Sequence, residues 1–313
     1  MTTSVEKLVV VTRRTRLEEL MVRFNTRGQA RFYITQSGAD FADYEEEQDT
    51  YQRALERLRR DLDLGMPRQF LDRRLVPTYS FRPGDAVIVI GQDGLVANVA
   101  KYAAGCPVVG VNPDPGRFDG VLLPFLVSQA RLAVEAVAGG RSAYRKVTLA
   151  EAVLRDGQRL LAFNDLFVGA RSHVSARYRI KIGEHTESQS SSGLLVSTGA
   201  GSTGWMSSVF NMAAGVARLT GGRAGQAIEL AWEDPRLLYA VREPFRSRHS
   251  GADLVAGVVE PGNGVQLESR MATNGVIFSD GMEDDFLAFD AGAIAEIRAA
   301  PCHALLAVPG PRQ

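Results

Sequence analysis

The first third of the chain alternates short apolar runs with helical patterns. Residues 7–13 read KLVVVTR, a valine-rich run that predicts a strand buried on both faces of a sheet. Apolar residues then recur at helical spacing between residues 17 and 24. Thr15, with Glu18 three positions later, predicts a capping box at the start of this helix.

A longer helical pattern runs from Asp40 to Leu64, and Gly65 and Pro67 are expected to end it. Its apolar stripe is formed by Phe41, Tyr44, Tyr51, Leu55, Leu58 and Leu62. The acidic residues 45–47 are expected on the solvent face. Because two tyrosines lie on the stripe, a subunit interface is a reasonable assignment for this helix.

Three further apolar runs follow, a weak one at 69–72 and stronger ones at 85–90 and 107–111. The stretch from Gly91 to Gly105, between the last two runs, has the length of a helix and a glycine at each end. Strand, glycine loop, helix and strand make a βαβ unit. This pattern favours an open sheet of parallel strands.

After about residue 140 helical patterns become scarce, apart from a segment at 202–219. Alternating or β-branched runs separated by glycines take over, at 145–149, 176–182, 193–197, 255–259 and 265–268. This texture is typical of a mostly β domain.

The fold class expected is therefore an α/β N-terminal domain with a parallel open sheet, followed by a mostly β C-terminal domain. We expect a nucleotide-binding domain at 1–138, with a helix at 124–138 at the junction, and a substrate-binding domain at 139–295. Residues 296–313 form a tail, of which 299–308 can pair back onto the first domain.

Composition agrees with this organisation. A length of 313 residues suits about two domains. The 36 Lys and Arg balance the 36 Asp and Glu, which argues against a protein whose main task is to grip nucleic acid or an acidic membrane. Two cysteines, Cys106 and Cys302, make no disulfide framework. With no secretory signal and no apolar run long enough to cross a bilayer, we expect a cytoplasmic protein.

The first candidate for chemistry is the loop Gly91-Gln92-Asp93-Gly94-Leu95, at the end of a strong strand. Ligands bind at the carboxyl ends of strands in open α/β sheets, and glycines let the backbone approach phosphate oxygens. Asp93 would then serve as a general base or a metal ligand. The alternative is a plain turn in which Asp93 caps the next helix.

The second candidate is the pair Asn164-Asp165, which lies between two apolar runs. Polar side chains are costly to bury without partners, so this pair can hold the hydroxyls or amines of a ligand. The same pair can equally form a turn, because both residue types favour turns.

The third candidate is the segment 192–208, a strand that leads into small residues, hydroxyls and a helix. Ser192, Thr203 and Ser208 offer hydrogen bonds, Gly204 allows close approach, and Trp205 offers a ring for stacking on a nucleotide. The alternative is a capped helix start with Trp205 in the core.

The order of these three segments resembles the NAD kinase family, within the superfamily of diacylglycerol kinases and phosphofructokinases. That family has a Gly-Gly-Asp-Gly-Thr loop, an Asn-Glu or Asn-Asp pair, and an Asp-Gly…Thr-Pro-Thr-Gly-Ser-Thr-Ala-Tyr segment. A late Ser-Asp-Gly turn at 279–281 is similar to the end of the family's second domain. The resemblance extends from about residue 86 to 281 and leaves out the helix at 40–64.

The resemblance implies a kinase that transfers the γ-phosphate of ATP, with Mg²⁺, to the 2′-hydroxyl of the adenosine ribose of NAD. Asp93 would take the proton, Gly91, Gln92 and Gly94 would face the phosphates, and the site would lie in a cleft between the domains. NAD would be bound by Asn164, Asp165, Ser192, Thr203, Gly204, Trp205 and Ser208. Relatives are usually dimers or tetramers, so a homo-oligomer is expected.

The chain also departs from the family pattern. Gln92 stands in place of a loop glycine, Leu95 in place of a threonine, and Ser192 in place of an aspartate. The last two changes remove polar contacts, each worth on the order of 1 to 3 kcal/mol if buried. Two alternatives therefore stay open: a kinase of this fold acting on a sugar, a lipid or another nucleoside, and a nucleotide-binding protein without turnover.

The remaining charged residues are expected to be structural or solvent-exposed. The four histidines show no metal-ligand spacing, so no protein-held metal is expected. Arg13, Arg14 and Arg16 follow the first strand and are expected to form a solvated basic patch. Asp280 is expected to be a hairpin residue.

Overall fold

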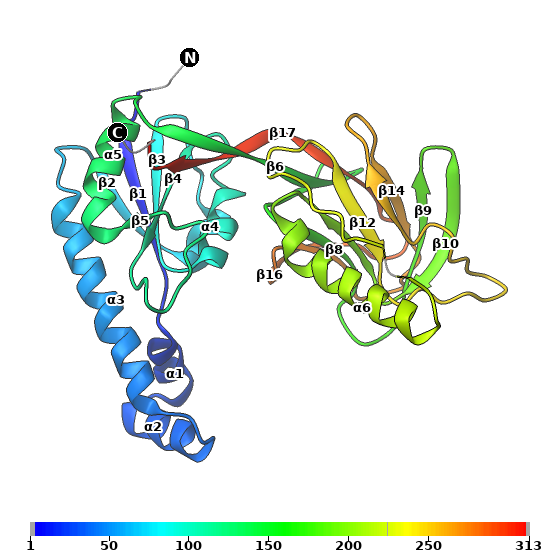
Figure 1. Cartoon of the computed structure of the whole chain (residues 1–313), viewed down its shortest axis with the longest axis horizontal. Coiled ribbons are helices and arrows are strands. Elements are labelled where there is room, and N and C mark those ends of the chain that lie inside the picture. The colour runs from blue at the N-terminus through cyan, green and yellow to red at the C-terminus, as the bar shows by residue number, and fades with distance from the viewer. Residues whose placement is uncertain (1–3, 224, 311–313) are drawn as a thin grey trace. The chain divides into compact units, whose positions relative to one another are not determined.

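The computed structural model describes residues 4–223 and 225–310. The chain divides into two compact units, labelled by element in Figure 1. Unit 1 comprises residues 1–145 and 305–313, and unit 2 comprises residues 146–304. The chain passes from unit 1 to unit 2 inside one strand and returns inside another.

Unit 1 is built on a parallel sheet with the strand order β2-β1-β3-β4. The strands are β1 (Lys7–Thr12), β2 (Arg68–Asp72), β3 (Asp85–Ile90) and β4 (Pro107–Asn112). A short strand, β5 (Phe125–Leu126), and the end of β17 (Ile294–Val308) also pair with β4 in parallel. Every residue of β3 is buried, because both faces of this strand are covered.

The helices of unit 1 cover this sheet. Helices α3 (Phe41–Asp61) and α5 (Ala130–Ala138) pack on the face that carries Leu8, Ile88 and Val109. Helix α4 (Asp93–Ala100) connects β3 to β4. Helices α1 (Arg16–Phe24) and α2 (Arg27–Gln36) form a smaller apolar cluster with the start of α3, and two 3₁₀ turns span Arg73–Thr78 and Val127–Gln129.

Of two local predictions for unit 1, one is confirmed and the other is wrong in its boundary. The capping box is confirmed, since Thr15 Oγ1 accepts the Glu18 N–H while the Glu18 carboxylate accepts the Thr15 N–H. The helix expected at 124–138 instead begins at Ala130, because Phe125 and Leu126 pair with β4. Edge pairing with the sheet takes the backbone hydrogen bonds that the first helical turn would have needed.

Unit 2 consists of two antiparallel sheets. One has the order β13-β12-β11-β8-β15-β16, and the other runs β10-β9-β14-β17, with β6 paired to β17 and β7 paired to β6. The strands are β6 (Ala143–Leu154), β7 (Arg159–Ala162), β8 (Asp165–Ala170), β9 (Ala176–Ile182), β10 (His185–Ser191), β11 (Leu194–Ser197), β12 (Leu237–Val241), β13 (Ala256–Val259), β14 (Val265–Ser269), β15 (Gly275–Ser279) and β16 (Met282–Ala288).

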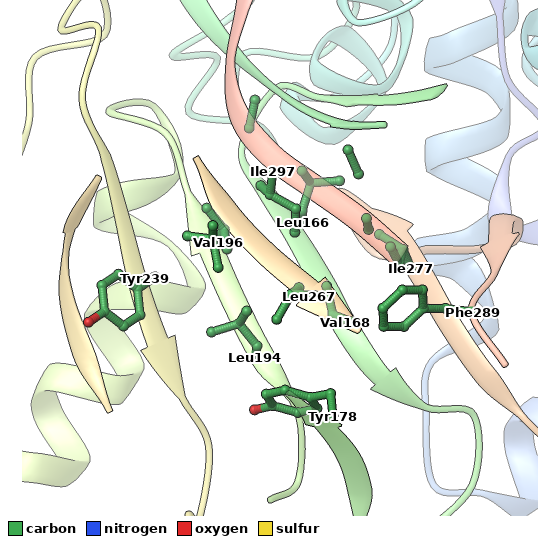
Figure 2. Close-up of a cluster of buried hydrophobic side chains, with 14 of the residues drawn as sticks. Leu166, Val168, Tyr178, Leu194, Val196, Tyr239, Leu267, Ile277, Phe289 and Ile297 are labelled. Carbon is green, nitrogen blue, oxygen red and sulfur yellow. The ribbon is translucent and has the colours of Figure 1, made fainter. Parts of the chain in front are cut away.

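Side chains from both sheets of unit 2 form one apolar core. Leu166, Val196 and Ile277 come from the first sheet, and Leu267 and Ile297 come from the second (Figure 2). Alternate residues of β9 are buried, as its period-two sequence predicts for a strand with one covered face. The predicted fold class, a parallel α/β domain followed by a mostly β domain, agrees with these two units.

Helix α6 (Trp205–Leu219) is the long helix of unit 2 and follows a 3₁₀ turn at Gly201–Thr203. Its first turns pack through Met206 against Leu195 and Leu238, away from the core between the two sheets. The last residues of the third candidate segment, 205–208, therefore form the first turn of this helix.

Candidate functional site

The strand order of unit 1 creates a switch point between β1 and β3. The chain leaves β1 toward β2 on one side and leaves β3 toward β4 on the other, and open α/β sheets bind ligands beside the carboxyl ends of strands at such a point. Arg13 directly follows β1, and Gly91 directly follows β3. The loop singled out from the sequence therefore stands where open α/β sheets bind ligands.

Asp93 is the first residue of α4 and is partly exposed at this edge. Its Oδ1 accepts a hydrogen bond of 2.6 Å from the backbone N–H of Leu122. The residue that caps α4 is Gln92, which is exposed and makes no capping bond with its side chain. The alternative in which Asp93 serves only as a helix cap is therefore wrong.

The two loop glycines differ in their surroundings. A methyl group on Gly91 would lie 2.9 Å from the side chain of Leu95, whereas one on Gly94 would meet no atom within 4 Å. Neither glycine has a positive φ, so a tight turn does not require them. The open space at Gly94, at the exposed start of α4, leaves room for a ligand to approach the helix N-terminus.

A buried ion pair underlies the Gly91 loop. Arg13 is 8% exposed and Glu47 only 4%, and Arg13 Nη2 donates to Glu47 Oε1 at 2.8 Å. The expectation that Glu47 lies on the solvent face of its helix is therefore wrong, as is the expectation that Arg13 belongs to a solvated patch. Arg16 also donates to Glu47 and to Asp43, so the two arginines and two acids form one network.

The electrostatics of this network follow from its partners. Burial alone would raise the pKa of Glu47, but hydrogen bonds from Arg16 and Arg13 more than offset burial and lower that pKa. Hydrogen bonds from Arg117 and Arg16 lower the pKa of Asp43 to about 2. Both acids are therefore ionised at neutral pH, and their negative charges are balanced by the arginines that they bind.

Tyr51 ties helix α3 to the switch point. Its hydroxyl accepts the N–H of Arg13 at 3.0 Å and donates to the carbonyl oxygen of Ile90 at 3.3 Å. Burial raises the pKa of Tyr51 to about 12, so the phenol stays protonated and can donate. The ring is 2% exposed, so Tyr51 is used inside unit 1 and does not support the interface assigned to this helix from the sequence.

In unit 2, Asn164 lies in the turn between β7 and β8, and Asp165 begins β8. The carboxylate of Asp280 accepts the N–H groups of Phe163, Asn164 and Asp165, at 3.0, 2.6 and 3.3 Å. Asp280 also forms the β15–β16 turn with a φ of 53°. It is thus the predicted hairpin residue, and in addition it shapes the second candidate segment, a role that sequence reasoning missed.

Asp165 is buried, and its Oδ1 has no hydrogen-bond partner among the described residues. Burial raises the pKa of Asp165 to about 7; a hydrogen bond with Ser197 opposes the rise, and the charge of Asp280 adds to it. An orphan buried oxygen is costly, which points to a partner outside the chain.

The third segment packs on the second. The Thr198 N–H donates to the Asn164 carbonyl at 2.9 Å, and the Thr198 hydroxyl donates to the Phe163 carbonyl at 2.7 Å. A methyl group on Gly201 would lie 2.3 Å from the same Asn164 carbonyl. The structure therefore brings Asn164 and Asp165 together with the loop that begins at Thr198.

Trp205 lies at the wall of a cavity of about 440 Å³ in unit 2. Its ring stacks on Phe167 with centroids 5.6 Å apart, and the Arg242 guanidinium lies 5.5 Å from the centroid of the Trp205 ring. Ser192 and Arg171 line the same cavity. Trp205 is therefore packed against other side chains on one part of its surface and faces the cavity with another. The cavity has the size of a small-molecule site.

Three more of the sequence-selected residues are exposed in this part of unit 2. Thr203 and Gly204 precede the first turn of α6, and Ser208 lies one turn into it. Asp93, Gly91, Gln92 and Gly94 belong to unit 1, and the other candidates belong to unit 2. No cluster of three or more His, Cys, Asp or Glu side chains suited to a metal occurs within residues 4–223 and 225–310.

Comparison with known proteins shows which sequences this chain is similar to. The chain is 36% identical over 129 residues to the NAD kinase of Thiobacillus denitrificans, a match covering 39% of this chain and 43% of that protein. It is 32% identical over 133 residues to the NAD kinase of Cupriavidus pinatubonensis, covering 40% and 42%. The chain is similar in sequence to NAD kinases over about two fifths of its length. The matches span less than half the length of these curated relatives, and no protein-family model matches the chain.

Solved structures of NAD kinases share the fold over almost the whole chain. Yeast NADH kinase, solved with NADH, aligns with a TM-score of 0.57 and 14% identity, covering 98% of this chain and 84% of that one. An NAD kinase from Archaeoglobus fulgidus, solved with ATP, gives 0.52 and 16%, covering 96% and 92%. Both alignments therefore extend into the helix at 40–64, which the sequence motifs left out.

Proposed function

We propose that the chain is an NAD(H) kinase-like phosphotransferase that moves the γ-phosphate of ATP to the 2′-hydroxyl of the adenosine ribose of NAD. The observation that carries this proposal is the position of Asp93, a partly exposed carboxylate at the switch point of a parallel sheet. The similarity to NAD kinases supports the reaction, and the ligands of the two solved relatives, NADH and ATP, support the substrates.

In this reaction Asp93 acts as the general base. One carboxylate oxygen is occupied by the Leu122 N–H, which leaves the other for the acceptor hydroxyl. The hydroxyl oxygen attacks the γ-phosphorus as its proton passes to Asp93, and the bond between that phosphorus and the bridging oxygen of ADP breaks. ADP leaves, and the new phosphate ester stays on the ribose.

The phosphates are proposed to approach the backbone of Gly91, Gln92 and Gly94 at the start of α4, where the helix dipole favours negative charge. Mg²⁺ would arrive on ATP and neutralise phosphate charge. This ion commonly keeps several waters and takes only one or two carboxylates from the protein.

The acceptor nucleotide is proposed to use the polar groups of unit 2. The orphan Oδ1 of Asp165 can accept a hydrogen bond from a ribose hydroxyl, beside Asn164 in the same turn. Trp205 and Ser192 line the cavity in unit 2, and Thr203, Gly204 and Ser208 supply hydroxyls and backbone groups close to Trp205 in the chain. The guanidinium groups of Arg171 and Arg242 in the same cavity suit a ligand that carries negative charge.

Two further assignments belong to this proposal. A homo-oligomer, dimer or tetramer, without nucleic acid or membrane as a partner, is the assembly proposed. A cytoplasmic location is proposed because neither cysteine forms a disulfide: Cys106 is buried and free, and Cys302 is also free. No helix among residues 4–223 and 225–310 combines the length and the apolar character that a bilayer crossing demands.

The test is an assay of NADP formation from NAD, ATP and Mg²⁺. The wild-type chain should form NADP, and Asp93→Asn should lower kcat by about 10²- to 10⁴-fold, the usual contribution of a general base. Asn keeps an oxygen for the Leu122 N–H, so the variant should fold normally. Asp119→Asn, at an exposed carboxylate of the same unit, is the control. ATP consumed only with a different acceptor, or nucleotide bound without turnover, would contradict the proposal.

A further inference from the structure

The loop that follows β4 contacts the general base from a distant part of the sequence. It runs from Pro113 to Pro124, and the backbone N–H of Leu122 donates to Asp93 Oδ1 across 29 residues. None of the motifs quoted for the family resemblance includes this loop. A carboxylate with one oxygen fixed by a rigid peptide has only the other oxygen free to accept a proton.

The peptide of Leu122 is pressed against the sheet. A methyl group on Gly110, in the middle of β4, would lie 2.0 Å from the Leu122 carbonyl oxygen. Two non-bonded atoms cannot approach so closely. Only glycine at position 110 therefore lets the Leu122 peptide pack directly against β4. Leu123, at 3% exposure, anchors the next residue in the core.

The turn before Leu122 is held by a buried side chain. Asn112 is 5% exposed, its Nδ2 donates to the Phe118 carbonyl at 3.0 Å, and its Oδ1 accepts the Asp114 N–H at 3.0 Å. Gly120 has a φ of 70°, and a methyl group there would lie 2.6 Å from Asn112 Nδ2. This turn therefore depends on the asparagine and the glycine together.

Helix α3 fixes the outer side of the loop. Arg117 Nη2 donates to Asp43 Oδ1 at 2.6 Å, and the ring of Phe118 lies 5.7 Å from the Arg13 guanidinium carbon. Arg13 is in turn paired with Glu47. The buried ion pair, the loop and the general base thus form one connected structure within unit 1.

We propose that Gly110, Asn112 and Gly120 are positioning residues for the reaction: they hold the Leu122 N–H on Asp93 so that one carboxylate oxygen is presented to the acceptor hydroxyl. The inference deepens the proposed function and rests on it for its kinetic part. Misplacing a reacting group by about 1 Å can cost on the order of 100-fold in rate, so a shift of this peptide should appear in kcat.

The first experiment needs no enzymatic activity. Amide hydrogen exchange is measured on the wild-type chain and on Asp93→Ala. The Leu122 amide should lose protection at least tenfold in the variant, while the Leu123 amide, which donates to the Gly120 carbonyl at 3.0 Å, should keep it. Equal protection of Leu122 in both proteins would overturn the inference.

The second experiment is a double-mutant cycle between Gly110→Ala and Asp93→Asn, with kcat and KM measured for NADP formation. Gly110→Ala should lower kcat at least tenfold and change KM less than about threefold, because the base is displaced and the nucleotide contacts are kept. In the Asp93→Asn background the same change should alter kcat less than about twofold. Additive effects on kcat would contradict a positioning role.

The control is Gly116→Ala, a matched substitution in the same loop. Gly116 is exposed, and a methyl group there would come no closer than 3.5 Å to Asp114 Oδ1. It should leave kcat unchanged, and an equal loss of kcat in Gly116→Ala and Gly110→Ala would overturn the inference. If Gly110→Ala does not fold, Asn112→Ser takes its place in the cycle. A wild-type chain that forms no NADP overturns the proposed function, and the exchange experiment then still decides whether Leu122 holds Asp93.

Discussion

Asp165 is an acid placed where ionisation is costly. It is 7% exposed, one of its oxygens has no partner among the described residues, and burial raises its pKa to about 7. In the unfolded chain the same carboxyl titrates near its ordinary value of 3.8. Between these values the folded protein holds a proton that the unfolded chain has lost. The stability due to Asp165 is therefore complete below about pH 4 and is lost as the pH rises through 7.

Asp165→Asn should remove this pH dependence. Relative to the wild type, the free energy of unfolding of the variant should rise between pH 5 and pH 8. The rise should be about 1.4 kcal/mol for each pH unit in this interval that lies below the pKa of Asp165. Urea unfolding at the two pH values measures the difference. Asp284→Asn, at an exposed carboxylate of the same unit, should show no such change. A constant difference for Asp165→Asn at both pH values would show that the carboxyl ionises normally.

Glu47 shows how a residue-level prediction can fail although its signal is present. It stands three residues after Tyr44 and four before Tyr51, so it lies on the apolar stripe by spacing alone. An unpaired glutamate is rarely buried, and Glu47 directly follows two other acids, Glu45 and Glu46. A solvent-exposed face was therefore the simplest interpretation. The partner that permits burial, Arg13, is 34 residues away and follows a different element.

At the scale of elements, the turn from β11 into α6 is packed so closely that it tolerates no added atoms. Beta-carbons on Gly199 and Gly201 would lie 1.8 Å from the Ala231 carbonyl oxygen and 2.3 Å from that of Asn164. Gly215 lies in the middle of α6, where a methyl group would meet nothing within 4 Å. Glycine is thus required by close contacts in the turn before α6, whereas inside the helix nothing in its surroundings requires it.

The two glycines should respond oppositely to alanine. Gly201→Ala should lower the free energy of unfolding by about 1 to 3 kcal/mol, because the Asn164 turn must move. Gly215→Ala should raise it by about 0.5 to 1 kcal/mol, because alanine costs less entropy in a helix. Urea unfolding of the two variants measures both effects. A stabilising Gly201→Ala would show that the loop is looser than its contacts indicate.

Element boundaries depended on tertiary pairing more than on local pattern. The expected strand at 176–182 coincides with β9, since its alternation is local. Helix α5 begins six residues later than the apolar pattern predicts, because β5 pairs with β4 first. The capping box at Thr15 was predictable, because both partners lie within one turn.

At the scale of the whole molecule, the chain enters unit 2 inside β6 and returns to unit 1 inside β17. Leu305 and Leu306 pair with Pro107 and Val108 of β4 in parallel. Ala307 is 1% exposed and belongs to the core under α3 and α5. The last described strand is therefore part of the unit formed by the start of the chain.

A chain that ends at Ala304 tests this arrangement. It should lose amide protection in β4 and at least about 2 kcal/mol of the stability of unit 1, because a buried Leu and a strand pairing are removed. Protection in β11, which belongs to unit 2, should stay unchanged and serves as the internal control. Full protection of β4 in the shortened chain would show that the returning strand adds nothing to unit 1.

The sequence by itself determined the elements whose information is local. Apolar runs such as 85–90 specify buried strands, period-two alternation specifies strands with one wet face, and the order of three motifs indicated the family. The assignment of Asp93 as the base also came from the sequence and stays a prediction.

Only the tertiary structure decided which distant groups meet. The Asp280 carboxylate reaches the Phe163 amide across 117 residues, and the Leu122 amide reaches Asp93 across 29. Neither bond leaves a mark on periodicity or composition, because a hydrogen bond between backbone and side chain depends on position in space and not on the type of the donor residue. The turn at Asn164 and the orientation of Asp93 are therefore properties of the folded chain.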